Sequence, residues 1–385
     1  MQRKQCSLAK LAGIALGLAL AGPVSARYIQ TNLISDNGSI PGTVTDPNLV
    51  NPWGMAASST GPFWVSDNGT GVTTLYNGNS GLPLSLVVTI PPAAGSAPGT
   101  TSTPTGQVFN NTSGFAITDA NGAGRSTFIF ATEDGTISAW KGGAPIQTTA
   151  IRVVDNSAAG AVYKGLAIGS SAAGDFLYAA NFSANKIDVF GATFAPALLS
   201  GAFTDPNLPA GFAPFNIQNL GGGLYVAYAA QDPAHPSNEL AGPGAGIVDV
   251  FNTDGVLLRR VATGGTLNAP WGLALAPADF GEFSNALLVG DFGDGLINAF
   301  DAGTDAFLGQ LTDPAGQPIS IDGLWGLRFG NDGAAGRSNE LFFTAGIRNE
   351  AGGLFGKLAA VPEPGTLSIV ALGVVMLGLR KKVTA

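Results

Sequence analysis

Short apolar runs separated by glycine-rich polar turns recur along most of the chain. In residues 268–300, NAPWGLALAPADFGEFSNALLVGDFGDGLINAF, three such runs are divided by two polar turns. Short runs rich in β-forming residues, with glycine turns between them, are typical of an antiparallel meander. The same order of runs appears in residues 51–76, NPWGMAASSTGPFWVSDNGTGVTTLY. A meander that returns at long spacing indicates a repeat architecture.

Six repeats can be counted from their opening strands. These strands begin near Trp53, Phe115, Lys164, Phe215, Trp271 and Trp325. Each repeat has a second and a third strand, and five have a fourth, whereas the sixth runs into the C-terminal tail after Leu358. The strand-like segment YIQTNLISD, Tyr28 to Asp36, can take the missing place. We therefore predict an all-β, six-bladed β-propeller over residues 27–358, closed by the N-terminal strand in the last blade, because closure leaves no sheet edge open.

The composition agrees with this fold. The 385 residues are 45% hydrophobic and only 11% charged, with 56 glycines and 24 prolines. Glycine and proline at this density suit a protein with many tight turns. Because a short four-stranded blade cannot bury its faces alone, we expect the aromatic side chains of the second strands to fill the layers between blades.

Residues 1–26 have the order of a secretory signal peptide. Three basic residues precede an apolar stretch, and small residues lead to a cleavage position after Ala26. The only cysteine, Cys6, lies in this segment, so we expect a mature chain without disulfides. We therefore expect the protein to be exported.

Residues 359–385 form a second targeting segment. An apolar run at 367–379 is flanked by Pro362, Glu363 and Pro364 before it and by Arg380, Lys381 and Lys382 after it. The run is shorter than the roughly 20 residues of a membrane-spanning helix, and the basic residues favour the cytoplasmic side. This tail resembles the PEP-CTERM sorting signal, although a plain tail anchor is the alternative. The resemblance implies transient inner-membrane contact through a short transmembrane sorting helix, an exosortase-type processing enzyme as partner, and a final location at the cell surface or outside the cell.

The charge excludes one class of partner. The whole chain carries a formal net charge of −8, and the domain between the two basic ends is more acidic still. Nucleic acids and anionic membranes require a basic surface. We therefore expect no nucleic-acid partner, whereas cations and neutral polysaccharide remain compatible with an acidic exported domain.

Two segments resemble a known class of propellers. They are LYAANFSANKIDVF, residues 177–190, and LLVGDFGDGLINAF, residues 287–300. Both resemble the blades of NHL and gluconolactonase-like propellers, which is specific for the fold and weak for function. The signal peptide, the NPWG propeller and the PEP tail together are similar to a family of uncharacterised exported propellers. That resemblance implies no established activity.

The opening strands provide the first candidate site. Propellers bind ligands at the mouth of the central channel, where these strands converge. The six opening residues named above therefore form a candidate ligand-binding ring of three tryptophans, two phenylalanines and one lysine. Such a ring could stack on sugar faces. The alternative is that each aromatic side chain packs the junction between blades.

The ends of the second strands provide the second candidate site. Asp67, Asn181 and Asp291 lie at equivalent positions, and either Glu133 or Asp134 occupies that position in the second repeat. Converging carboxylate and amide oxygens could hold Ca²⁺. The alternative is that each side chain accepts hydrogen bonds from the tight turn that follows it.

Enzymatic activity is less expected than binding. Gluconolactonase-like propellers hold a divalent metal with Glu, Asn and Asp at their opening strands, where this chain has PWG, KGL and APFN. The only histidine is His235, in a loop. With no cysteine in the mature chain and one histidine, a thiolate nucleophile, a Ser-His-Asp triad and a multi-histidine metal site are excluded. Two hypotheses remain: a non-catalytic propeller that binds polysaccharide or another matrix component, and a metal-dependent lactonase-like hydrolase.

Overall fold

A computed structural model of the protein describes residues 27–361. Apart from two single-turn 3₁₀ helices, η1 (Ser157–Ala159) and η2 (Gly281–Phe283), the regular structure of this part is β. No helix within residues 27–361 is long and apolar enough to cross a membrane. The predicted signal peptide and the predicted sorting tail from residue 362 onward lie outside the described residues.

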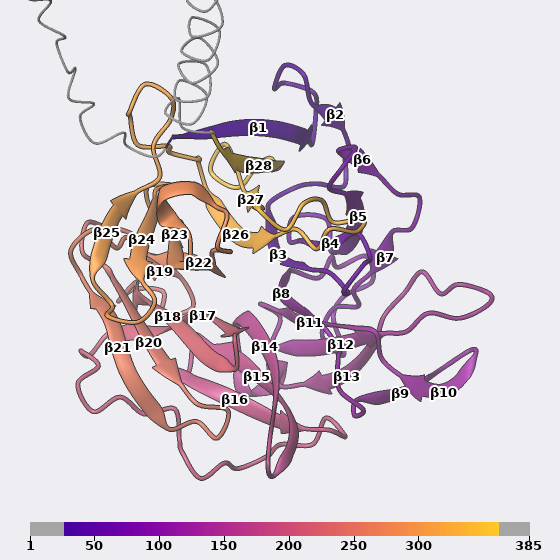
Figure 1. Ribbon diagram of the computed structural model, residues 1–385. Helices are drawn as coiled ribbons and strands as arrows, with labels where there is room; N and C mark the ends of the chain where they lie inside the picture. The colour runs from indigo at the N-terminus through magenta and orange to yellow at the C-terminus, as the bar shows by residue number, and fades with distance from the viewer. Residues whose placement is uncertain (1–26, 362–385) are drawn as a thin grey trace, which may run out of the picture. The chain divides into compact units, whose positions relative to one another are not determined.

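Six sheets, antiparallel apart from one short parallel pair in the last blade, surround a central channel, and the described part is therefore a six-bladed β-propeller, as predicted (Figure 1). Blade 1 contains β3 (Pro52–Ala56), β4 (Phe63–Asp67), β5 (Val72–Asn77), β6 (Leu82–Pro83) and β7 (Val88–Thr89). Blade 2 contains β8 (Pro104–Phe109), β11 (Phe128–Thr132), β12 (Thr136–Trp140) and β13 (Ile151–Asp155). Blade 3 contains β14 (Tyr163–Ser171), β15 (Gly174–Asn181) and β16 (Lys186–Gly191).

The second half of the ring continues the pattern. Blade 4 contains β17 (Phe212–Leu220), β18 (Gly223–Gln231), β19 (Glu239–Leu240), β20 (Gly246–Phe251) and β21 (Leu257–Thr263). Blade 5 contains β22 (Pro270–Leu275), β23 (Ala286–Asp291), β24 (Ile297–Asp301) and β25 (Phe307–Gln310). Blade 6 contains β26 (Leu324–Phe329), β27 (Glu340–Ala345), β28 (Leu354–Ala360), β1 (Tyr28–Ser35) and β2 (Val44–Thr45).

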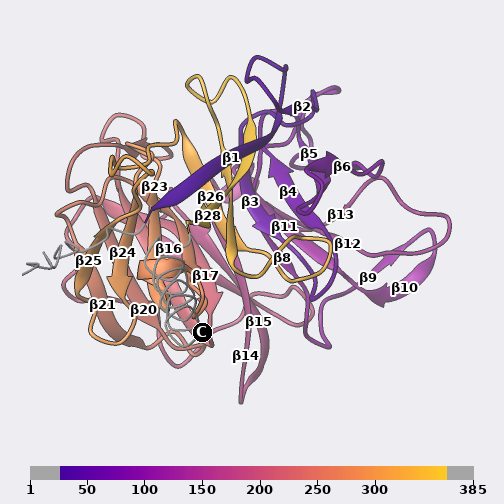
Figure 2. The same cartoon turned by 45° about the horizontal axis from the view of Figure 1, so that its top comes forward.

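The N-terminal strand closes the ring, as the sequence predicted. β1 pairs antiparallel with β28, from Tyr28 opposite Ala360 to Ser35 opposite Leu354. Figure 2 shows β1 along the edge of blade 6. The Tyr28 hydroxyl donates a hydrogen bond to the carbonyl oxygen of Phe280 at 2.9 Å, which ties β1 to blade 5 as well. The edge of β28 is thereby paired with the start of the chain.

The first strand of blade 2 differs from the prediction. The innermost strand is β8, whereas the predicted opening strand at Phe115 belongs to a separate hairpin of β9 (Ala116–Asp119) and β10 (Gly122–Arg125). This hairpin projects from the ring in both views (Figures 1 and 2). Phe115 packs against Phe194, with ring centroids 5.2 Å apart, in the layer between blades 2 and 3. The channel position assigned to Phe115 is therefore wrong, and Thr105 in β8 takes it.

Glycines let the innermost strands approach one another around the channel. A Cβ atom on Gly54 would lie 2.6 Å from the carbonyl oxygen of Thr105, and one on Gly106 would lie 2.3 Å from the amide nitrogen of Leu166. Both distances are too short for any side chain. Glycine follows the channel-facing residue because the next blade passes at this point.

A fourth strand predicted for blade 3 at residues 197–203 does not form. Ala197 still donates its amide to the carbonyl oxygen of Val189 at 2.9 Å, but Gly201 donates to Asp254 in the turn of blade 4 at 2.8 Å. The segment leaves its own blade to bond with the next. The prediction that aromatic side chains of the second strands fill the layers between blades is confirmed, since Trp64 of blade 1 stacks on Phe128 of blade 2 with ring centroids 4.1 Å apart.

Candidate functional site

Four predicted channel residues pack together as an aromatic plug, which comprises Trp53, Phe215, Trp271 and Trp325. The Trp53 and Trp325 rings stack with centroids 3.6 Å apart, and Trp271 meets Trp53 edge-on at 6.0 Å. None of the four side chains is more than 2% exposed. Because the rings are buried, they close the channel by packing against one another. This agrees with the interpretation that the aromatic side chains pack the junctions between blades, and not with a ring that stacks on sugar.

Lys164, the non-aromatic member of the predicted ring, lies over this plug. Its ammonium nitrogen is 5.3 Å from the centroid of the Trp53 ring and 5.5 Å from that of Phe215. It forms ion pairs with Glu133 at 3.2 Å and with Glu239 at 2.8 Å. Burial lowers the pKa of Lys164, but the two carboxylates outweigh it and raise that pKa above its usual value. Lys164 is therefore a buried cation held between two acids.

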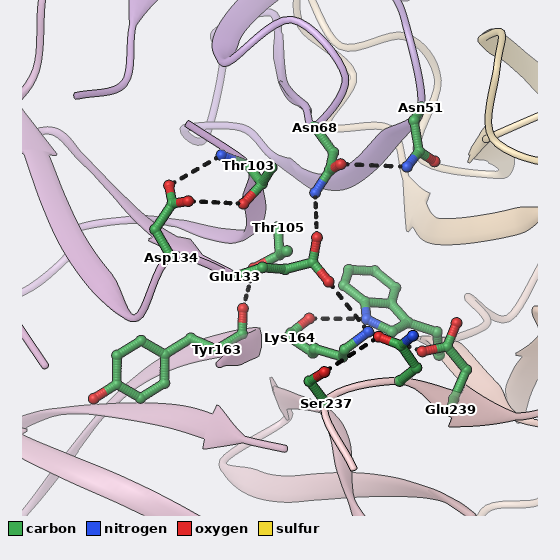
Figure 3. Close-up of polar contacts among 12 residues, drawn as sticks. Asn51, Asn68, Thr103, Thr105, Glu133, Asp134, Tyr163, Lys164, Ser237 and Glu239 are labelled. Carbon is green, nitrogen blue, oxygen red and sulfur yellow. Dashed lines mark hydrogen bonds and ion pairs between the residues drawn. The ribbon is translucent and has the colours of Figure 1, made fainter. Parts of the chain in front are cut away.

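A chain of hydrogen bonds connects the plug to this ion pair, and Figure 3 shows its part from Asn51 through Asn68 to Glu133. The Trp325 indole donates to Asn51 at 3.0 Å, and Asn51 donates to Asn68 at 3.4 Å. Asn68 in turn donates to the second carboxylate oxygen of Glu133 at 3.0 Å. The orientation of Glu133 is therefore set by loops of blades 1 and 6 as well as by Lys164.

A cavity of about 500 Å³ opens above Lys164 at this mouth of the channel. The side chains of Glu133, Glu239 and Glu350 line it together with Lys164. Phe292 also lines it; this ring is half-buried and stacks on Trp325 with centroids 4.1 Å apart. We call this space the channel-mouth cavity. It combines three acidic side chains, one buried cation and an accessible aromatic face.

Glu350 differs from the other two acids because it forms no ion pair within residues 27–361 and its pKa lies near neutrality. Burial, with smaller contributions from Glu239 and Glu133, raises the pKa of Glu350 to about 7, and Lys164 opposes the rise. A carboxyl group with this pKa exchanges a proton readily near neutral pH. The charge of the channel-mouth cavity therefore changes around pH 7.

The loop that carries Glu350 has an unusual backbone. Arg348, Asn349 and Glu350 have φ angles of 60°, 51° and 64°. A left-handed conformation costs roughly 1–2 kcal/mol for each residue that has a Cβ atom. The loop is held by Asp322, which accepts the Arg348 amide at 2.8 Å, and by Asp36, which pairs with the Arg348 guanidinium at 2.6 Å. Strain of this kind is typical of functional loops, and here it places Asn349 and Glu350 at the cavity.

The predicted metal-binding residues lie in three different blades and bond within them. Asp67 accepts from Thr74 at 2.8 Å, Asn181 donates to Asp188 at 2.8 Å, and Asp291 accepts from Asn298 at 2.7 Å. None of the three lines the channel-mouth cavity. Burial raises the pKa of Asp291 to about 8 and that of Asp67 well above its usual range. Each side chain thus links the second and third strands of its own blade.

The acids of the described propeller do not gather into a metal site. Within residues 27–361, no group of three or more His, Cys, Asp and Glu side chains could hold a metal ion. Of the two alternatives in blade 2, Glu133 pairs with Lys164, whereas Asp134 accepts hydrogen bonds from Thr103 (Figure 3). Asp134 also accepts a hydrogen bond from the Ser102 hydroxyl. His235 is exposed and lies 3.2 Å from Asp232, as expected for a loop residue.

Five residues that line the cavity were missed from the sequence, among them its aromatic residue Phe292 and the acids Glu239 and Glu350. Phe292 directly follows Asp291, and its position after a second strand was a usable signal. Glu239 lies in an insertion of the fourth repeat, and Glu350 lies in a turn with no glycine at its left-handed positions. Neither of these acids belongs to a position that the repeat pattern makes equivalent between blades.

Comparisons with known proteins place the chain in a family without indicating an activity. The fold and the site described above define the protein as a six-bladed propeller with a cavity of about 500 Å³ at one mouth of its channel. No protein-family model matches it. The chain is 34% identical over 337 residues to uncharacterized protein R648 of Acanthamoeba polyphaga mimivirus. The aligned region covers 86% of this chain and 80% of the viral protein. Uncharacterized protein L690 of the same virus is 32% identical over 336 residues, covering 86% and 85%. The chain belongs to the same family as these two proteins.

Solved structures support the fold alone. A protein of unknown function from Bacteroides thetaiotaomicron has a TM-score of 0.53 at 10% identity, covering 88% of this chain and 77% of that one. The soluble aldose sugar dehydrogenase of Escherichia coli has a TM-score of 0.50 at 13% identity, covering 86% and 99%. These neighbours agree with the resemblance to NHL and gluconolactonase-like propellers at the level of the fold.

The substitution Lys164→Met tests whether the ion pairs balance the buried acids. We expect the free energy of unfolding at pH 7.5 to fall by about 3–5 kcal/mol, because removing one partner leaves buried charge uncompensated. The loss should shrink at pH 5, because Glu350, with a pKa of about 7, is protonated there and no longer adds negative charge to the cavity. Urea unfolding at both pH values measures this difference. An equal loss at both values would show that Lys164 acts only through packing.

Proposed function

We propose that the protein binds a neutral, hydroxyl-rich ligand, such as a saccharide unit of an extracellular polysaccharide, without transforming it. The observation that carries the proposal is the accessible face of Phe292 beside the carboxylates of the channel-mouth cavity. Sugar hydroxyls donate to carboxylates, and the apolar face of a sugar ring packs on an aromatic ring. A cavity of about 500 Å³ suits one or two sugar units.

Lys164 supports a binding role over a metal-dependent one. Its ammonium already lies between Glu133 and Glu239, where a cation would otherwise be attracted. A metal-dependent, lactonase-like hydrolase, or a Ca²⁺ site at Asp67, Asn181 and Asp291, would require these side chains to rearrange. Calorimetric titration with Ca²⁺ before and after Asp291→Ala examines that alternative directly.

We also infer that the protein is exported and sorted to the cell surface or extracellular matrix. The support is the sequence of the two ends, with cleavage after Ala26 and recognition of Pro362-Glu363-Pro364 by an exosortase-type enzyme. Mass spectrometry of the protein from the cell surface would then find residue 27 at its start and the tail removed. Finding the intact tail in the membrane fraction would instead support a permanent anchor.

The substitution Phe292→Ala tests the binding proposal. We expect it to weaken saccharide binding by at least about tenfold, because one aromatic contact contributes on the order of 1 kcal/mol or more beyond its buried area. A glycan array with the purified protein identifies the saccharide, and calorimetry with that saccharide measures the change.

Phe307→Ala is the matched control. Phe307 lies on the outer strand β25, is 48% exposed and does not line the channel-mouth cavity. It should leave saccharide binding unchanged. Binding that survives Phe292→Ala, or no bound glycan at all, would overturn the proposal. Release of a shortened or ring-opened product during the titration would favour the hydrolase.

A further inference from the structure

A second cavity lies along the innermost strands, away from the channel-mouth cavity. It has a volume of about 280 Å³ and is lined by residues of β3, β8, β14, β17 and β26. Five of the six innermost strands therefore border it, which places it in the central channel. On four of these strands the first residue that lines the cavity lies two or three positions after the residue at the aromatic plug or at Lys164. These first residues are Met55, Gln107, Leu166 and Gln218. We call this space the lower-channel cavity.

One cation faces this cavity without an acid to balance it. Arg328, in β26, lines the lower-channel cavity, and no Asp or Glu is among the residues that line it. Within residues 27–361, the Arg328 guanidinium has no hydrogen-bond or ion-pair partner. Partial desolvation by the surrounding channel wall lowers the pKa of Arg328, although the side chain stays exposed in part and an arginine remains charged at neutral pH. The Arg328 side chain keeps an exposed surface, so its unpaired guanidinium is accessible to a ligand inside the channel.

Amide groups accompany Arg328. The Gln218 side chain lines the same cavity and, among the described residues, has no hydrogen-bond partner. Gln107 donates to the carbonyl oxygens of Gly54 at 2.8 Å and Trp64 at 2.7 Å, which leaves its buried Oε1 atom without a donor. The cavity therefore presents the N–H donors of the Arg328 guanidinium, the unpaired amide of Gln218 and the unsatisfied acceptor Oε1 of Gln107.

We propose that the lower-channel cavity binds an oxyanion group of a small ligand through Arg328. A planar guanidinium donates two parallel hydrogen bonds to a carboxylate, phosphate or sulfate. Gln218 can donate to a further oxygen, and Gln107 can accept from a hydroxyl group of the same ligand. A sugar acid provides both groups in a molecule that a volume of about 280 Å³ admits. This site is independent of the proposed saccharide site, since it uses none of the residues of the channel-mouth cavity.

Calorimetric titration with two probes tests the proposal. Sodium glucuronate represents an anionic sugar unit, and sodium sulfate represents a free inorganic anion. We expect at least one to bind the purified protein at low ionic strength and to bind Arg328→Gln at least about tenfold more weakly, because a hydrogen bond to a charged group contributes roughly 1.5–3 kcal/mol. Glucuronate binding alone would identify a sugar acid as the ligand class, and sulfate binding alone would identify an inorganic anion.

The control variant is Lys186→Gln, which removes the same charge from an exposed side chain, 58% accessible, that does not line the lower-channel cavity. It should bind both probes as the unaltered protein does. Because Arg328 has no partner to lose, Arg328→Gln should unfold at an unchanged or higher temperature. Arg328→Lys keeps the charge without the fork and should bind with intermediate affinity. Absence of binding by the unaltered protein, or equal binding by Arg328→Gln, would overturn the proposal.

Discussion

Substitution of Trp325 by alanine is expected to lower the free energy of unfolding by about 3–5 kcal/mol, the usual range for a buried large aromatic side chain. Trp325 is fully buried and touches every other ring of the aromatic plug, as well as Phe292. Its indole also donates the hydrogen bond to Asn51 that begins the chain leading to Glu133. Loss of the indole ring would leave a void in the aromatic plug, which separates the channel-mouth cavity from the lower-channel cavity.

Urea unfolding followed by tryptophan fluorescence measures this effect, and Phe307→Ala again provides the comparison. Phe307 is a large aromatic residue too, but half of it is already exposed, so its loss should change the unfolding free energy by less than about 1 kcal/mol. A similarly small change for Trp325→Ala, combined with loss of saccharide binding, would mean that the ring serves as a stacking surface and not as a plug.

The fold was largely predictable because the propeller repeats one local pattern. Alternating apolar runs and glycine turns identify second and third strands in every repeat, and the vacancy in the last blade identifies the role of β1. Blade 2 was misassigned for a local reason. The segment PTGQVF follows a run rich in proline and threonine and looks like a loop, whereas AITD after Phe115 looks like an opening strand. AITD does form a strand, but it pairs with β10 in a hairpin outside the blade.

The candidate site was predictable only where it uses repeat positions. Lys164 was found because it occupies an opening position, and Glu133 was found as one of two alternatives at the end of a second strand. Glu239 and Glu350 come from an insertion and from a strained turn, whose positions depend on contacts between distant segments. The left-handed backbone at Arg348, Asn349 and Glu350 is stabilised by Asp36 and Asp322. No pattern local to that turn encodes those contacts.

Removal of residues 28–36 is expected to have the largest effect on the whole molecule. β1 provides the outer partner of β28 along its full length, and β2 pairs only with β1 in blade 6. The deletion also removes Tyr28, which packs against Phe280 and Phe283 in the hydrophobic core shared by blades 5 and 6. It would leave an open sheet edge and lose the link between the start of the chain and the last blade. We expect loss of cooperative thermal unfolding, with aggregation at lower temperature than the intact protein.

Tyr28→Phe separates strand pairing from the single hydrogen bond. It retains β1 and the ring contacts and loses only the hydroxyl that donates to Phe280, so the free energy of unfolding should fall by about 1 kcal/mol. The deletion should therefore be far more damaging than the point substitution. A deletion variant that unfolds at the same temperature as the intact protein would mean that β1 does not stabilise the propeller. The contacts between neighbouring innermost strands would then be sufficient to hold the last blade in place.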